Sequence, residues 1–136
     1  MNASLHIAAI AGTLTLALSA AAGATTVRLV PLSPPVIGAT IGSCAVPFAP
    51  AGVTAAAPEL PVIAAAQNVT GIAAVRVALD ARGRLVGESI LNSSGNRWLD
   101  RAALRTARLS RYAAETRNCG RVGGEYALVV DFTDRT

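Results

Sequence analysis

The sequence predicts a two-layer α+β domain, in which a short helix is followed by a β-β-α-β order. The expected sheet has three antiparallel strands, with a helix packed on one face. Three patterns predict this fold: an alternation of period two over residues 73–80, an apolar face of period 3.6 over 98–112, and an apolar run over 125–132. The 136 residues are 52 % hydrophobic and 15 % charged, so a packed core is feasible.

The first two strands are predicted as a β-hairpin. Apolar residues at every second position give the first strand one buried face, made of Ala73, Val75, Val77 and Leu79. Asp80-Ala81-Arg82-Gly83 is a turn sequence, with glycine where a positive φ is expected. Leu85 to Asn92 follows as the second strand.

A helix is predicted from Trp98 to Tyr112, after the strand-breaking and capping residues of Ser93-Ser94-Gly95-Asn96. Its small and apolar positions recur at helical spacing and form one face: Leu99, Ala102, Ala103, Thr106, Ala107 and Ser110. Small side chains there favour close approach to a sheet. Trp98 is the sole tryptophan and is interpreted either as core packing or as part of a contact surface.

The last strand is predicted from Glu125 to Phe132, after a loop over residues 117–124. One side carries apolar and aromatic residues: Tyr126, Leu128, Val130 and Phe132. The strand is either central or an exposed edge, and periodicity does not decide between them. A short helix is also expected over Pro61 to Asn68, with the proline in its first turn.

The N-terminal segment, residues 1–24, is interpreted as a signal peptide. Ile7 to Ala22 is rich in alanine and leucine, and Ala22-Gly23-Ala24 has the small-x-small pattern of a cleavage site. The alternative is a weak inner-membrane anchor, made poor by Gly12 and Ser19. In either case the rest of the chain is expected outside the cytoplasm, in the periplasm or secreted.

Residues 25–60 are expected to be extended or irregular, because six of the seven prolines lie there and the seventh is Pro61. The two cysteines, Cys44 and Cys119, suit an oxidising compartment and are predicted to pair, with two free thiols as the alternative. A disulfide would tie this segment to the predicted domain over residues 61–136.

Composition argues against most catalytic chemistry. All twelve basic residues are arginine, and the single histidine, His6, lies in the predicted leader. A histidine base, a Schiff-base lysine and a histidine-ligated metal are therefore excluded from the exported part. The acidic pair Asp131 and Asp134 has no positioned partner in the sequence. We expect a binding or structural protein that is not an enzyme, with no catalytic residues, no cofactor and no metal.

The predicted helix carries arginines on its outer side. A solvated surface is the ordinary interpretation of such a pattern, and the alternative is a surface for anionic partners, formed by Arg97, Arg101, Arg105 and Arg108. Nucleic acid is not expected as a partner, since aromatic residues are scarce and the chain is exported. A membrane is expected as a partner only if the N-terminal segment stays uncleaved.

The run from Pro61 to Phe132 resembles the C-terminal domain of TonB-type energy transducers. The most specific element is Ser93-Ser94-Gly95 followed by Leu99-Asp100-Arg101-Ala102-Ala103. The strand from Ala74 to Asp80, the glycine turn and the final Gly124-to-Phe132 strand also match. The resemblance covers about half of the chain.

This resemblance implies a periplasmic, protein-binding domain whose last strand adds a short segment, the TonB box, of an outer-membrane receptor. The family couples the proton-motive force to transport of siderophores, cobalamin and similar cargo. By position, the partner-binding residues would be Glu125, Tyr126, Ala127, Leu128, Val129, Val130, Asp131 and Phe132. Main-chain hydrogen bonds would supply the affinity.

Two other hypotheses remain open at this stage. A stand-alone envelope protein would use the arginine helix on anionic surfaces, and its binding would be strongly salt-sensitive. A homodimer is also open, because short sheets with free edges recruit other strands, including those of a second copy.

Overall fold

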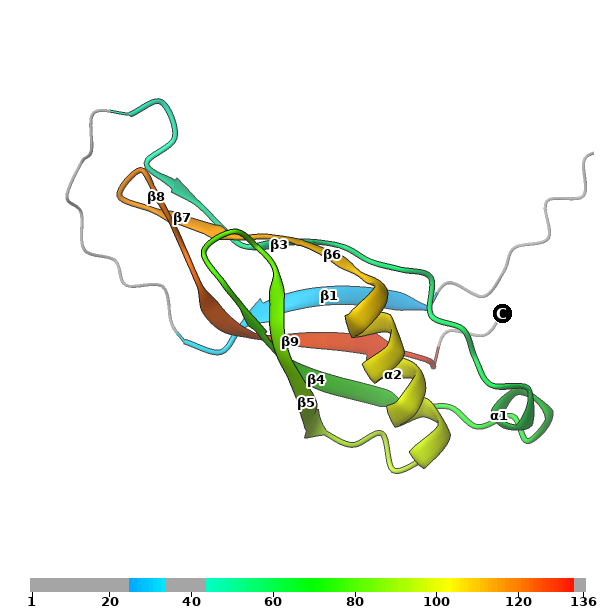
Figure 1. Cartoon of the computed structure of the whole chain (residues 1–136). Helices are drawn as coiled ribbons and strands as arrows, with labels where there is room; N and C mark the ends of the chain where they lie inside the picture. Colours follow the sequence, from blue (N-terminus) through cyan, green and yellow to red (C-terminus); the bar gives the residue numbers. More distant parts are fainter. Residues whose placement is uncertain (1–24, 34–43, 134–136) are drawn as a thin grey trace, which may run out of the picture.

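The computed structural model describes residues 25–33 and 44–133, and its main layer is a four-stranded antiparallel sheet (Figure 1). The strands lie in the order β1-β9-β4-β5, with bounds β1 Thr26–Pro31, β9 Gly124–Asp131, β4 Ile72–Leu79 and β5 Leu85–Asn92. Helix α2, Arg97–Leu109, covers one face of this sheet. The prediction of an α+β fold with an antiparallel sheet is confirmed, while the predicted count of three strands is wrong.

The predicted hairpin forms between β4 and β5. The Asp80 carboxylate accepts hydrogen bonds from the main-chain N–H groups of Arg82 and Arg84, each at 2.9 Å. Gly83 has a φ of 80°, and a Cβ there would lie 2.8 Å from the carbonyl oxygen of Tyr112. The turn therefore needs glycine for two reasons, its left-handed backbone and its contact with the chain that follows α2.

Helix α2 begins at a side-chain cap. The Asn96 Oδ1 atom accepts hydrogen bonds from the N–H groups of Trp98 at 2.8 Å and Leu99 at 3.4 Å. The helix ends at Leu109, earlier than the predicted Tyr112, because Ser110 is already extended and strand β6, Arg111–Ala113, begins. Strand β6 pairs with β3, Gly52–Thr54.

The core lies between α2 and the sheet. The six predicted face residues of α2 are all buried, as is the predicted face of β4. Alanines 102, 103 and 107 keep the helix close to the sheet, and Ala51, Val53 and Leu60 from the proline-rich segment pack against the same core. The predicted short helix is confirmed as α1, Val62–Ala66, a single turn that buries Ala64.

The predicted loop over residues 117–124 is instead a small hairpin. Its strands are β7, Glu115–Arg117, and β8, Gly120–Val122, and β7 also pairs with β2, Phe48–Ala49. Cys119 lies at the tip with a φ of 68° and forms the predicted disulfide with Cys44. The disulfide holds the proline-rich segment against this hairpin.

The fourth strand of the main sheet comes from the segment expected to be extended or irregular. Strand β1 pairs with β9 along its whole length, from Thr26 opposite Asp131 to Pro31 opposite Tyr126. The division into residues 1–24, 25–60 and 61–136 stays a prediction, although β1, β2 and β3 all pair with strands of the third region.

Strand β9 is consequently central, with β4 on one side and β1 on the other. Of the two positions that the sequence left open for the last strand, the structure has the central one. The free edge that the family resemblance implied for Glu125 to Phe132 is absent here, because β1 occupies it. The predicted leader or anchor over residues 1–24 lies outside the described residues. Within the described ranges, no helix has the length and hydropathy needed to cross a membrane.

The disulfide closes a loop with a sequence separation of 75 residues. We expect the double variant Cys44→Ser/Cys119→Ser to lose up to about 4–5 kcal/mol of unfolding free energy, because the unfolded chain gains conformational freedom. Urea titration of the two proteins measures the difference. A midpoint equal to that of the oxidised parent protein would contradict the expectation.

Candidate protein-binding site around the last strand

The side chains of β9 alternate between the core and the opposite face of the sheet. Tyr126, Leu128 and Val130 are at most 4 % exposed, and Phe132 continues their side beyond the strand. Glu125 and Asp131 belong to the other face, where Glu125 lies 3.6 Å from Arg76 of β4. The predicted partner-binding residues therefore lie together on one strand, but half of their side chains are already used by the core.

The main-chain N–H and C=O groups of β9 are also largely paired with neighbouring strands. Both of its sides carry a ladder, and the N–H of Leu32 extends the β1 side with a 3.3 Å hydrogen bond to the carbonyl of Glu125. Among the described strands of this sheet, those at its two borders are β1 and β5.

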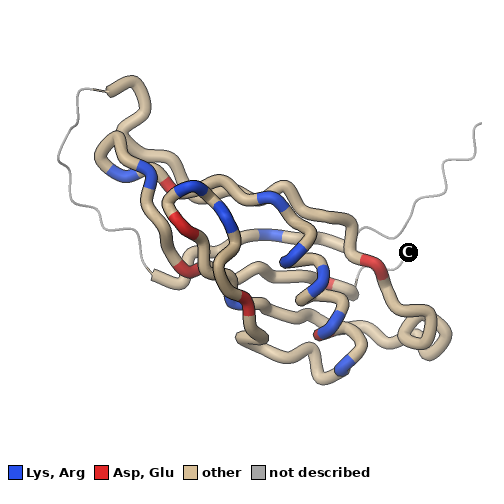
Figure 2. Tube along the Cα trace, in the orientation of Figure 1, with Lys and Arg blue, Asp and Glu red and all other residues tan. Residues whose placement is uncertain are grey.

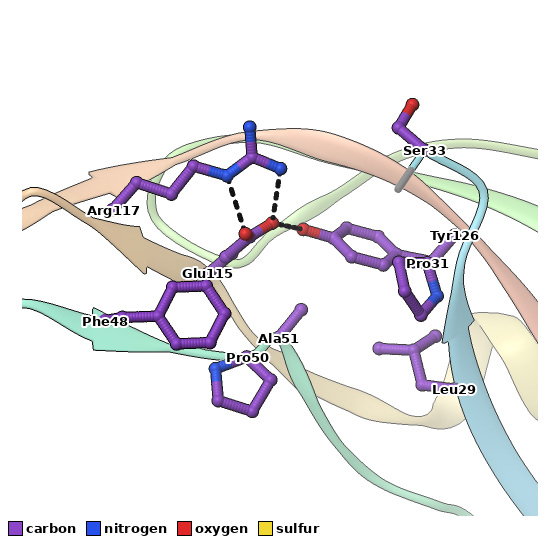
Figure 3. Close-up of a pocket in the computed structure, with 9 residues that line it drawn as sticks. All are labelled: Leu29, Pro31, Ser33, Phe48, Pro50, Ala51, Glu115, Arg117 and Tyr126. Atoms are coloured by element: carbon purple, nitrogen blue, oxygen red, sulfur yellow. Dashed lines mark hydrogen bonds and ion pairs between the residues drawn. The ribbon is translucent and has the colours of Figure 1, made fainter. Parts of the chain in front are cut away.

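A cavity of about 240 Å³ lies at the C-terminal end of β1 (Figure 3). Its walls come from β1, β2, β7, β9 and the chain between β2 and β3. The residues around it are Leu29, Pro31, Ser33, Phe48, Pro50, Ala51, Glu115, Arg117 and Tyr126. A second cavity, of about 160 Å³, shares five lining residues with the first: Pro31, Ser33, Glu115, Arg117 and Tyr126. The end of β1 is thus less closely packed than the core.

A buried carboxylate forms the polar wall of the cavity. Glu115 accepts hydrogen bonds from Arg117 Nε at 2.6 Å, from Arg117 Nη2 at 3.2 Å and from the Tyr126 hydroxyl at 2.9 Å (Figure 3). The two bonds from Arg117 stay within β7, and the bond from Tyr126 joins β7 to β9. Glu115 was not predicted as a site residue, although the Glu-Thr-Arg spacing of residues 115–117 puts opposite charges on one side of a strand.

The same contacts shift two pKa values. The hydrogen bond from Arg117 lowers the pKa of Glu115 below its ordinary value of 4.5, with Tyr126 adding to the effect against the opposing influence of burial. Burial raises the pKa of Tyr126 to about 12, and its bond to Glu115 acts in the same direction. At neutral pH the cavity therefore holds a charged carboxylate and a neutral phenol.

Arginines recur along α2 (Figure 2), and the four at positions 97, 101, 105 and 108 are exposed. Two of them face acidic groups: Arg108 Nε is 2.6 Å from Glu88 Oε1, and Arg105 Nη2 is 3.6 Å from Glu59 Oε2. The guanidinium carbons of Arg97 and Arg101 lie 4.7 and 5.5 Å from the centroid of the Trp98 ring. The four predicted arginines share one face, but each already has a partner there.

The Ser-Ser-Gly and Leu-Asp elements meet in one hydrogen-bond network. Asp100 accepts from the Ser93 hydroxyl at 2.6 Å, from the Ser94 hydroxyl at 2.7 Å and from the Ser94 N–H at 2.8 Å. Burial acts to raise the pKa of Asp100, but these bonds outweigh it and lower the pKa below its ordinary value. The motif therefore fixes the angle between β5 and α2, and its role is structural.

The described residues contain no group of three or more histidine, cysteine or acidic side chains arranged to hold a metal. The model of the family described as the Gram-negative bacterial TonB protein C-terminal matches residues 56–133. The chain belongs to this TonB C-terminal family. No curated protein and no solved structure gives a significant match to the chain.

TonB C-terminal domains are non-enzymatic transducer or binding domains, are periplasmic in general, and interact with proteins such as outer-membrane receptors. The matched range contains β4, β5, α2 and β9, whereas β1, β2 and β3 precede it. Strand β1 therefore pairs with the last strand of the TonB C-terminal domain from outside the matched region.

We expect Glu115→Gln to lower the unfolding free energy at pH 7 by about 1–3 kcal/mol, because charge-assisted hydrogen bonds to a buried carboxylate are lost. Since the folded pKa of Glu115 is lowered, its stabilisation is complete above the ordinary value of 4.5 and disappears as the pH falls through the folded pKa. The difference between parent and variant should thus shrink below that pH.

Urea titrations at several pH values measure this difference, and acidic groups common to both proteins cancel in it. Glu125→Gln is the matched control, because the Glu125 side chain is 55 % exposed and should change stability little. A stability gap for Glu115→Gln that does not depend on pH would contradict the expectation.

Proposed function

We propose that this protein is an exported, TonB-like protein-binding module that receives a partner segment by β-strand addition. Its partner would be a short periplasmic segment of an outer-membrane receptor, and its role would belong to TonB-dependent energy transduction and outer-membrane transport. The observation that carries the proposal is the family match over residues 56–133, which spans the whole β4-β5-α2-β9 unit.

The last strand suits the role of acceptor. One of its faces is fixed in the core by Tyr126, Leu128 and Val130, so its main chain is held in position before a partner arrives. An added strand forms main-chain hydrogen bonds with such a template and takes its selectivity from the alternate side chains. The acceptor residues proposed are Glu125 to Phe132, on the side of β9 that β1 occupies in this structure.

The compartment is part of the proposal. Residues 1–24 would act as a signal peptide, with retention as an inner-membrane anchor as the alternative. The Cys44–Cys119 disulfide supports an oxidising compartment outside the cytoplasm.

Synthetic peptides that copy the periplasmic N-terminal segments of TonB-dependent outer-membrane receptors test the function. We expect some of them to bind the purified protein, measured by fluorescence anisotropy. N-methylation of the peptide amides that face β9 should weaken binding by about tenfold or more, because each methyl group removes one main-chain donor.

The matched control is the same peptide methylated at the amides that point away from β9, which keeps every side chain. Equal loss for the two methylated peptides, or no binding by any receptor peptide even to a Leu29→Asp variant with a weakened β1, would overturn the proposal. Binding to vesicles of anionic lipid without peptide binding would favour the arginine-helix alternative.

A further inference from the structure

We propose that β1 is an intrachain competitor, which fills the acceptor side of β9 and must leave before a partner strand is added. This inference rests on the proposed function and concerns the regulation of the same site. Its starting point is topological: β1 lies outside the matched TonB C-terminal region, yet it forms six register pairs with the last strand of that region.

The two neighbours of β9 differ in how firmly they are held. In β4, Ala73, Val75 and Val77 are fully buried, so removing this strand would open the core. No residue of β1 is fully buried, because Val27 and Leu29 are half-buried and the other four residues are exposed. The loss of β1 would therefore cost far less apolar burial than the loss of β4.

Side chains add little to the attachment of β1. Within the part of the chain that the structure describes, none of its side chains makes a hydrogen bond or an ion pair. Cavities of about 240 and 160 Å³ lie beside Pro31 at its end. Attachment thus depends on the main-chain ladder, two half-buried side chains and the charge attraction between Arg28 and Asp131 of β9.

The rest of the proline-rich segment is held independently of β1. Strand β2 pairs with β7, strand β3 pairs with β6, and Cys44 is bonded to Cys119. Residues 34–43 separate these attachments from β1 in the sequence. Release of β1 consequently requires neither reduction of the disulfide nor unfolding of the small sheets.

The register between β1 and β9 predicts the residue pattern of a partner segment that could replace β1. It would run antiparallel to β9, with apolar side chains at the two alternate positions that Val27 and Leu29 fill opposite Val130 and Leu128. The residue between them, Arg28, lies on the face that carries Asp131. A short extended segment with a basic residue between two aliphatic residues is therefore the kind of partner that fits.

A peptide with the sequence of residues 25–32 is the probe, because it reproduces β1 without requiring a known partner. Leu29→Asp should weaken the intrachain strand by placing a charge opposite Leu128. We expect the fluorescent peptide to bind Leu29→Asp about tenfold or more tightly than the parent protein, since apparent affinity rises with the fraction of protein whose acceptor side is free. Val86→Asp is the matched control: Val86 is 66 % exposed on β5, at the opposite border, and binding should not change.

A protein in which a disulfide locks β1 to β9 should bind the peptide less well than the parent protein. Arg28 and Val129 are register partners, so Arg28→Cys/Val129→Cys should join β1 to β9 through a second disulfide, with the pairing checked by peptide mass mapping. We expect the locked protein to lose peptide binding, while Arg28→Ser/Val129→Ser, which has similar side chains and no bridge, keeps it.

Peptide binding that is equal in the locked and serine proteins, or no tighter in Leu29→Asp, overturns the inference. Should Leu29→Asp fail to fold, hydrogen exchange of the parent protein decides: β1 amides should exchange about tenfold or more faster than those of β4, and equal protection contradicts the inference.

The receptor peptides separate this inference from the proposed function. If they bind the parent and locked proteins equally, the function stands and the competitor role of β1 fails. If the β1 peptide behaves as expected while no receptor peptide binds even Leu29→Asp, β1 is a displaceable strand and the proposed receptor function fails.

Discussion

The structure depends on the main-chain ladder along β9, which is bonded to β4 on one side and to β1 on the other. Because one face of β9 is buried in the core, slipping the register by one residue would turn Leu128 and Val130 away from it. Burial and register therefore fix each other. The same rigidity makes the strand a good template for a partner, and an unpaired template would be a site of aggregation.

The proline-rich segment has a structural role that its composition conceals. It supplies β1 to the main sheet, β2 and β3 to the two small sheets, and apolar side chains to the core. The disulfide connects the β7–β8 hairpin to this segment, and the hydrogen bond between Tyr126 and Glu115 connects it to β9. A domain with a modest core thus gains order from contacts between distant parts of the chain.

The elements that the sequence predicted well are those specified by neighbouring residues. The alternation in β4, the Asp80–Gly83 turn and the apolar face of α2 are local patterns, and their buried faces agree with prediction. Strand β1 is different: its six residues include Pro31, and the strand that buries Val27 and Leu29 lies about a hundred residues away. Without that partner, Thr26–Pro31 carries too little signal to be distinguished from its proline-rich surroundings.

The β7–β8 hairpin was missed because its three-residue strands lack an apolar alternation, and the bond between Glu115 and Tyr126 depends on that hairpin. The sequence left open whether the last strand is central or at an edge. A residue pattern shows which side chains are buried, whereas the place of a strand in the sheet depends on which other strands pair with its main chain.

The disulfide also determines which bonds would bear tension if the protein were stretched between its two ends. Residues 45–118 lie inside the covalent loop closed by Cys44 and Cys119, so a pull on the N-terminal segment passes from Cys44 directly to Cys119 and on to β9. Helix α2 and the β4–β5 hairpin lie inside this loop and are bypassed by the force. The contacts of β1 are outside it and would break first. Mechanical work on this molecule would thus remove β1 first and reach the pairing of β9 with β4 next, while the elements inside the loop carry no tension.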